Sequence, residues 1–289
     1  MAIARVRAVG SAADRRLPPH AYFLASAVFH YLGPAFAVLL FQRVDVLGVA
    51  WLRIATAAVV FAVWRRPWRL FAGQVRWTLV GLGAVLGAMN CCFYLAISRL
   101  PLGTVGAIEF LGPIALAALG ARTGRNLAAL AAAIAGVAFL TDVRLAGEPA
   151  GFVFAFANCG LFTLYVILGH RVARDGGGAG IDRLGAAMLV ALLVVTPVGI
   201  GGASPAFASP ALLGAGIGVG ICSSVIPYVC DQLAMSRLPR ATFALLLALL
   251  PATATVIGLA VLRQVPTPAD ITGVSLVIIG VALHGAGPE

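Results

Sequence analysis

The chain is built almost entirely from apolar runs that are long enough to cross a lipid bilayer. A spanning α-helix needs about 20 predominantly apolar residues, at a rise of about 1.5 Å per residue. Apolar runs separated by turn residues or arginines predict ten helices, near 21–41, 46–64, 77–97, 102–121, 127–141, 150–169, 184–201, 212–235, 241–262 and 271–286. The sequence therefore predicts an all-α polytopic membrane protein with ten transmembrane helices.

The composition agrees with this prediction and excludes several other classes of protein. Charged residues make up 10% of the chain, whereas soluble domains carry about 25%. All twenty basic residues are arginines that lie between apolar runs, so the net charge of +10 indicates membrane topology and not a nucleic-acid partner. The four histidines are scattered and the five cysteines all lie in apolar runs, without the spacing of a metal site or a catalytic motif. We expect no metal, no cofactor and no enzymatic activity.

The distribution of the arginines predicts the orientation of the helices. With the N-terminus in the cytoplasm, fifteen arginines fall in inner loops and one, Arg53, lies within a span. The outer loops hold only four: Arg43, Arg99, Arg144 and Arg263. This bias holds only for an even number of spans, so we expect both termini in the cytoplasm. Residues 1–20 lack the long hydrophobic region of a signal peptide and are expected to form a cytoplasmic tail.

Two related stretches indicate an internal repeat. AISRLPLGTVGAIEFLGP (96–113) aligns without a gap with AMSRLPRATFALLLALLP (234–251) and shares an arginine and two prolines with it. The first SRLP falls on the outer side of the predicted topology and the second on the inner side. We therefore expect two inverted five-helix repeats, at 21–142 and 143–289. Inverted repeats are common in secondary transporters, which bind substrate near the bilayer midplane between the halves.

The same stretches resemble a known group of transporters. GAMNCCFYLAISRLPLGTVGAIEFLGP (87–113), PYVCDQLAMSRLPRATFALLLALLP (227–251) and WLRIATA (51–57) are similar to the drug/metabolite transporter superfamily, in its EamA-type ten-helix branch. Within that branch they are most like the bacterial threonine/homoserine exporter group. The sequence departs from that group at Asp231, where the exporters tend to have glutamate, and at Cys91, where they tend to have an aromatic residue.

The resemblance implies secondary active export of amino acids or similar small metabolites by alternating access. It places the chain in the bacterial cytoplasmic (inner) membrane, as a monomer or homodimer. The sequence contains no ATP-binding motif, so transport is expected to use a gradient, with protons as the coupling ion. The alternatives are an exporter of unrelated small metabolites or drugs, and a membrane channel or scaffold that transports nothing.

Ionisable residues within spans mark candidate functional positions, because each costs about 2.5–3.5 kcal/mol on insertion scales and usually faces the bundle interior. Arg53 and Glu109 each lie about two turns from the outer end of their spans, so they could form an ion pair. The helix face around Glu109 is small, with Gly106 and Gly112 among its neighbours, so a substrate or another helix can come close. Glu109 is therefore expected to form a structural pair, to contact substrate, or to do both if the pair opens.

Other polar residues within the spans complete the candidate site. We predict that substrate binds in a pocket between the halves, lined by His30, Asn90, Tyr94, Glu109, Tyr165 and Tyr228. Hydrogen bonding between helices is the alternative role for each of these side chains. Asp231 joins Arg53 and Glu109 as a candidate coupling residue, unless it reaches the cytoplasmic interface instead. The prolines within spans are candidate hinges or static kinks: Pro34, Pro113, Pro227 and Pro251.

The predicted topology can be tested by thiol labelling of intact cells. A cysteine introduced in GASPAFASP (202–210) should react with a membrane-impermeant reagent from outside, because this segment is predicted to be an outer loop. A cysteine in RDGGGAG (174–180) should react only after the membrane is permeabilised. The unsubstituted chain measures background labelling of the native cysteines, and the reverse pattern would overturn the predicted orientation.

Overall fold

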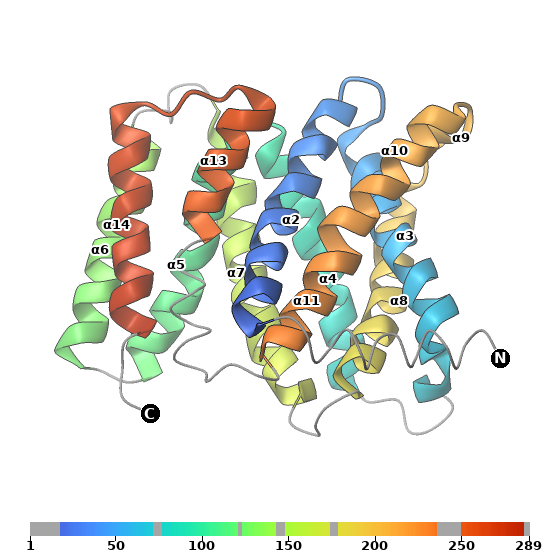
Figure 1. Ribbon diagram of the computed structural model, residues 1–289, viewed down its shortest axis with the longest axis horizontal. Coiled ribbons are helices and arrows are strands. Elements are labelled where there is room, and N and C mark those ends of the chain that lie inside the picture. Colours follow the sequence, from blue (N-terminus) through green and yellow to red (C-terminus); the bar gives the residue numbers. More distant parts are fainter. Residues whose placement is uncertain are drawn as a thin grey trace.

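The computed structural model describes residues 18–71, 77–120, 123–142, 148–173, 179–235 and 250–285, and it is helical throughout these ranges, apart from short connections. The long helices form one bundle, with α6 and α14 at one end and α3, α8 and α10 at the other (Figure 1). The helices are α2 (Pro19–Leu40), α3 (Val46–Arg65), α4 (Trp77–Ile97), α5 (Leu102–Gly120), α6 (Gly124–Asp142), α7 (Pro149–Ala173), α8 (Ala179–Gly199), α9 (Ser204–Phe207), α10 (Pro210–Gly220), α11 (Ile226–Met235), α13 (Leu250–Leu262) and α14 (Pro268–Gly285). A 3₁₀ turn, η1 (Pro67–Phe71), follows α3, and a π-helical turn, η2 (Ile221–Val225), joins α10 to α11.

The helices occur where the apolar runs predict them, with small differences at the ends. The largest shift is in α8, which begins at Ala179, five residues before the predicted start at 184. Asp182 lies in the first turn of α8 and forms an ion pair of 2.6 Å with Arg65 at the end of α3. An acidic residue in the first turn also favours the helix dipole, so α8 extends beyond its apolar part. The predicted span 241–262 is described only from Leu250 onward.

The length and composition of the helices identify a polytopic membrane protein. Within the described ranges, six helical stretches are long and apolar enough to cross a membrane: Ala21–Leu40, Val46–Arg65, Trp77–Ile97, Pro149–Leu168, Gly180–Gly199 and Pro210–Cys230. Shorter apolar helical stretches occur at Leu102–Gly112, Gly124–Leu140, Leu250–Leu262 and Pro268–Leu283. The count of ten spans, their orientation and the inverted repeat remain predictions.

The stretch from α10 to α11 is continuous but irregular at its centre. In the π-helical turn η2, the amide of Ile226 bonds to the carbonyl of Ile221, five residues earlier. The next residue is Pro227, which has no N–H and cannot donate to the carbonyl of Ser223, four residues before it. Two causes of local irregularity therefore fall within seven residues, in the middle of an apolar helix.

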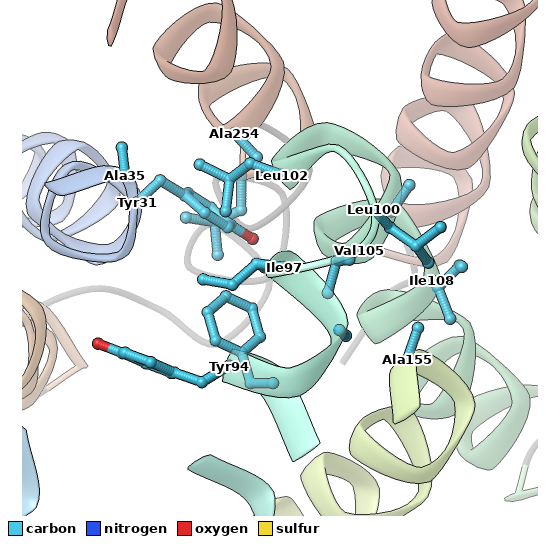
Figure 2. Packing of buried hydrophobic residues seen from close by; sticks show 14 of the residues in the cluster. Tyr31, Ala35, Tyr94, Ile97, Leu100, Leu102, Val105, Ile108, Ala155 and Ala254 are labelled. Carbon is cyan, nitrogen blue, oxygen red and sulfur yellow. The ribbon is translucent and has the colours of Figure 1, made fainter. Parts of the chain in front are cut away.

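Small residues allow the helices to pack closely. A Cβ added at Gly136 of α6 would lie 2.6 Å from the carbonyl oxygen of Gly273 of α14, and one added at Gly273 would lie 2.7 Å from the carbonyl oxygen of Gly136. Backbone contact of this kind is typical of helix association in membranes, where apolar burial alone gives no driving force. The main buried cluster extends from α6 and α14 toward α2, and in it the fully buried Tyr31 lies beside Leu102 and Ala254 (Figure 2).

Two glycine-to-alanine substitutions test whether this packing stabilises the fold. Gly136→Ala should lower the thermal melting point in detergent, because overpacking of a close contact costs about 1–3 kcal/mol. Gly160→Ala on α7 is the matched control, since an added Cβ there meets no atom of the described residues within 4 Å. Alanine favours a helix over glycine, so the control should melt at the same temperature or slightly higher. Equal melting points for the two variants would show that the contact between α6 and α14 is not needed.

Candidate functional site

Glu109 lies on a face of α5 that two glycines open to neighbouring helices. A Cβ added at Gly106 would lie 3.1 Å from the hydroxyl oxygen of Tyr31 on α2. A Cβ added at Gly112 would lie 3.0 Å from the carbonyl oxygen of Cys159 on α7. The small face predicted around Glu109 is therefore confirmed, and helices α2, α7 and α13 pack against it.

The carboxyl group of Glu109 is buried and has an amide partner. Its Oε1 accepts a hydrogen bond of 3.2 Å from Nδ2 of Asn158 on α7. Glu109 is 4% exposed and Asn158 is fully buried. Glu109 also interacts electrostatically with Tyr31. The hydroxyl of Tyr31 and the Oδ1 atom of Asn158 have no hydrogen-bond partner among the described residues.

Arg53 of α3 is held by the irregular segment between α10 and α11. Its Nε donates to Oγ of Ser224 at 2.8 Å, and its Nη2 donates to the carbonyl oxygen of Ser223 at 2.9 Å. The guanidinium carbon also lies 5.4 Å from the centre of the Tyr94 ring, which is within cation–π range. With only 5% of its surface exposed, Arg53 is a buried charge whose contacts come from neutral groups.

Arg53 and Glu109 do not form the direct ion pair that their similar depth suggested. Arg53 binds the two serines and Glu109 binds Asn158, although Arg53 still acts electrostatically on both Glu109 and His30. The reason is helix packing: α3 packs on α4, α8, α10 and η2, whereas α5 packs mainly on α6, α7, α13 and α14. The similar depth predicted for the two residues therefore does not bring their side chains into contact.

Two predicted residues of α4 lie near Arg53. Tyr94 provides the ring beneath the guanidinium, and Asn90 lies one turn earlier on the same helix. The Nδ2 of Asn90 donates to the carbonyl of Leu86 at 3.1 Å, but its Oδ1 has no partner within the described part of the chain, nor has the Tyr94 hydroxyl. A buried polar group without a partner costs about 1–3 kcal/mol. These oxygens are therefore suited to bind a polar ligand or water.

The remaining predicted residues are more dispersed. His30 is partly exposed, and its ring packs edge-on against the ring of Tyr31, with the two ring centres 5.3 Å apart. Tyr165 and Tyr228 pack with a second buried cluster formed largely by α3, α4 and α8. The side chain of Asp231 lies outside the described part of the structure.

The four candidate hinge prolines lie in different settings. Pro34 is inside α2, Pro113 is inside α5, Pro227 follows the π-helical turn, and Pro251 is the second residue of α13. Whether any of them bends during transport remains a prediction. Pro227 alone combines a missing backbone donor with an adjacent irregular turn.

Sequence patterns did not identify several residues of this region. Tyr31 and Ser223 have no feature that distinguishes them from other residues in apolar helices. Asn158 is recognisable from the sequence as an amide in the middle of an apolar span, suited to bind a zwitterion, but it is not among the predicted pocket residues. Ser224 could have been found from its position near Pro227, where freed backbone groups collect polar side chains.

Comparisons with known proteins identify the family. The profile of the EamA-like transporter family matches residues 149–285. The threonine/homoserine exporter RhtA of Escherichia coli (strain K12) is 32% identical over 251 residues, covering 85% of this chain and 84% of the exporter. The chain belongs to the EamA-like transporter family. A second family relative, the threonine/homoserine exporter RhtA of Salmonella typhimurium (strain LT2), is 31% identical over 250 residues, with coverage of 85% and 84%.

A solved structure shows that the fold of this family member has a known counterpart. One crystal structure superimposes with a TM-score of 0.58, covering 91% of this chain and 96% of the other. Sequence identity between the two is 19%, so the match concerns the fold. The resemblance to the drug/metabolite transporter superfamily is thereby confirmed by family and relatives, and the architecture has a precedent over nearly the full chain.

A double-mutant cycle tests whether the contact between Glu109 and Asn158 stabilises the protein. Asn158→Leu should lower stability because it leaves the buried carboxyl group without a donor. Adding Glu109→Leu should recover part of that loss, giving a coupling of about 0.5–3 kcal/mol. Melting points in detergent measure the cycle, and strictly additive losses would count against the contact.

The same cycle with Arg53→Leu and Glu109→Leu measures their electrostatic coupling without a direct hydrogen bond. Because each single substitution removes one charge and leaves the opposite charge buried without it, we expect the two single losses of stability, measured as melting points in detergent, to sum to more than the loss in the double variant. Additive effects would show that the two charges are independent.

Proposed function

We propose that this protein is a secondary active transporter that exports small amino acids from the bacterial cytoplasm by alternating access, coupled to protons. The observation that carries the proposal is the state of the two buried charges: Arg53 and Glu109 are each hydrogen-bonded to neutral groups and not to each other. An amino acid carries one carboxylate and one ammonium group. Arg53 suits the first and Glu109 suits the second, and each neutral partner can be exchanged for the ligand.

The polar atoms without partners support the same proposal. The hydroxyls of Tyr31 and Tyr94 and the Oδ1 atoms of Asn90 and Asn158 are buried, and they come from helices α2, α4 and α7. Phenol and amide groups can complete the hydrogen bonds of a zwitterion, with few polar groups left unpaired. The relatives named as threonine/homoserine exporters make small hydroxylated amino acids the first substrates to test.

The packing of the helices supports an inverted repeat. Suppose that α2 to α6 correspond in order to α7, α8, the α10–α11 stretch, α13 and α14. A two-fold rotation that exchanges these two sets of helices should then convert every helix–helix contact into itself or into another contact that is present. The contacts α3–α8, α5–α13 and α6–α14 each map onto themselves, and α2–α11 maps onto α4–α7; all of these contacts are present. A two-fold axis between the halves is common in transporters that work by alternating access.

Sequence spacing gives the candidate residues the same symmetry. The spacing from Arg43 to Arg171, which relates the echoing FQRV and GHRV segments, also separates His30 from Asn158. Equivalent positions of an inverted repeat lie at equal distances from the midplane. His30 and Asn158 are therefore expected on opposite sides of one central site, which supports the proposed location of substrate binding.

A second pair of candidate residues follows the same rule. The spacing from Pro101 to Pro239 in the two SRLP segments also separates Asn90 from Tyr228. Both are polar side chains on buried positions of corresponding spans. The two pairs together support a polar site between residues 21–142 and 143–289.

Glu109 and Asn158 offer a route for coupling to protons. In the structure Nδ2 of Asn158 donates a hydrogen bond to Oε1 of Glu109. If Glu109 takes up a proton, rotation of the amide brings Oδ1 into position to accept from the carboxyl O–H. Asn158 can therefore satisfy either protonation state, so that proton uptake need not leave a buried group unpaired.

Transport by purified protein in liposomes tests the proposal directly. With L-threonine as the first probe, we expect labelled substrate to accumulate in vesicles in exchange for protons, and to stop accumulating when a protonophore removes the gradient. Vesicles without protein measure leakage. Movement of larger drugs but not amino acids would favour the broader exporter alternative, and uptake that ignores every gradient would favour a channel.

Glu109→Gln tests the role of the carboxyl group. The substitution keeps the size of the side chain and removes its charge, so proton-driven uptake into inverted vesicles should be abolished while the protein still inserts and melts as a folded species. Exchange of labelled for unlabelled substrate without net proton movement measures whether binding survives. Full activity with unchanged pH dependence would leave Glu109 as a structural residue.

A further inference from the structure

We propose that Pro227 and the π-helical turn η2 form the positioning element for Arg53, and that they aim its guanidinium at the carboxylate of the transported substrate. This inference rests on the proposed function and adds to it the residues that determine selectivity for carboxylate-bearing substrates. The residues are Ser223, Ser224 and Pro227, all on the stretch from α10 to α11.

The first step is the loss of one backbone donor. In a regular α-helix the carbonyl of Ser223 would accept a hydrogen bond from the amide of residue 227. Pro227 has no amide hydrogen, so this bond cannot form. In the structure the Ser223 carbonyl accepts from Nη2 of Arg53 at 2.9 Å. The proline therefore keeps an acceptor available for the charge on another helix.

The second step is the direction given to the guanidinium. Ser224 accepts from Nε at 2.8 Å, so the serine hydroxyl and the Ser223 carbonyl bind along one edge of the planar group. The Tyr94 ring lies 5.4 Å from its central carbon. A guanidinium has five N–H donors, and three of those on Arg53 have no acceptor among the described residues. Those donors include one N–H on Nη1 and one on Nη2, which lie side by side at the end of the group, and a pair of this kind recognises a carboxylate with two parallel hydrogen bonds.

The third step is the fixed position of the turn itself. A Cβ added at Gly33 of α2 would lie 2.5 Å from Cβ of Ser223, and one added at Gly220 would lie 2.5 Å from Cβ of Thr56 on α3. The Ser26 hydroxyl on α2 also donates to the Pro227 carbonyl, at 3.3 Å. The irregular turn therefore packs closely against both α2 and α3. A turn held in this way can keep the acceptors for Arg53 in a fixed position.

These contacts also explain why the turn is irregular where it is. π-helical turns cost stability relative to an α-helix and frequently occur at functional sites. Here the irregular segment supplies acceptors to a buried charge that a regular helix could not supply, because regular helices satisfy their own carbonyls. The substrate class that follows is a small molecule with a free carboxylate.

Two variants test the positioning role in liposomes, with inhibition of labelled L-threonine uptake as the readout. Unlabelled L-threonine and L-threoninamide, which lacks the carboxylate, are compared as competitors. Ser224→Ala removes the acceptor of Nε, and Pro227→Ala restores an amide that competes for the Ser223 carbonyl. We expect each variant to lose about fivefold or more of the preference for L-threonine over the amide, because hydrogen bonds to charged groups are the stronger kind.

Ser223→Ala is the matched comparison, since its hydroxyl donates to the Val219 carbonyl of its own helix and not to Arg53. We expect it to change the preference much less than Ser224→Ala does, because its backbone carbonyl is retained. An unchanged preference in both Ser224→Ala and Pro227→Ala would overturn the inference. A wild-type protein that moves no amino acid would instead refute the proposed function.

A measurement that needs no substrate distinguishes a failure of the positioning role from a failure of the proposed function. Hydrogen–deuterium exchange of peptides covering 221–228 should become faster in Ser224→Ala, where the turn loses one bond to Arg53. It should become slower in Pro227→Ala, where the turn can gain a helical hydrogen bond. Exchange rates equal to those of the wild type in both variants would show that the hydrogen bonds to Arg53 do not stabilise the turn.

Discussion

The burial of one positive charge among apolar helices is the constraint on which the centre of this structure depends. A guanidinium removed from water needs hydrogen-bond acceptors, and a regular transmembrane helix uses all of its carbonyls internally. Arg53 obtains its acceptors from the stretch that departs from regular helix, at Ser223 and Ser224. The buried charge therefore needs the irregular stretch as a source of acceptors, and the irregular stretch uses its free acceptors to bind that charge. The contact also ties α3 to the α10–α11 stretch, which lies in the other half of the chain.

The buried carboxyl group of Glu109 also has a neutral hydrogen-bond partner on another helix. Glu109 is bonded to Asn158 on α7, and glycines on either side of it let α2 and α7 approach. Both charges thus depend on neutral partners from helices distant in sequence. A direct ion pair would hold the two charges to each other, and a substrate would have to break it. Neutral partners leave each charge able to exchange one hydrogen bond for another, which suits a group that binds and releases a ligand.

Much of the fold could be predicted from the sequence, because membrane helices must satisfy their own backbone and their apolar runs are long. The spans, the small face around Glu109 and the freed carbonyl before Pro227 all follow from local rules about residue type and spacing. The contacts of Arg53 and Glu109 could not be predicted in the same way. Similar depth suggested that the two would meet, but depth does not determine which faces of two helices point toward each other.

The sequence by itself determined that this chain is a polytopic helical membrane protein, because only self-satisfied helices with apolar surfaces tolerate the bilayer. Its motifs also placed the chain within a transporter superfamily, as the relatives and the family match confirm. Tertiary structure alone decided that Arg53 is held by Ser223 and Ser224, that Glu109 is held by Asn158, and that the Tyr31 hydroxyl lies against Gly106 on the helix of Glu109. The physical reason is that these contacts join residues more than forty positions apart, and glycine-mediated packing of the helices sets which side chains meet.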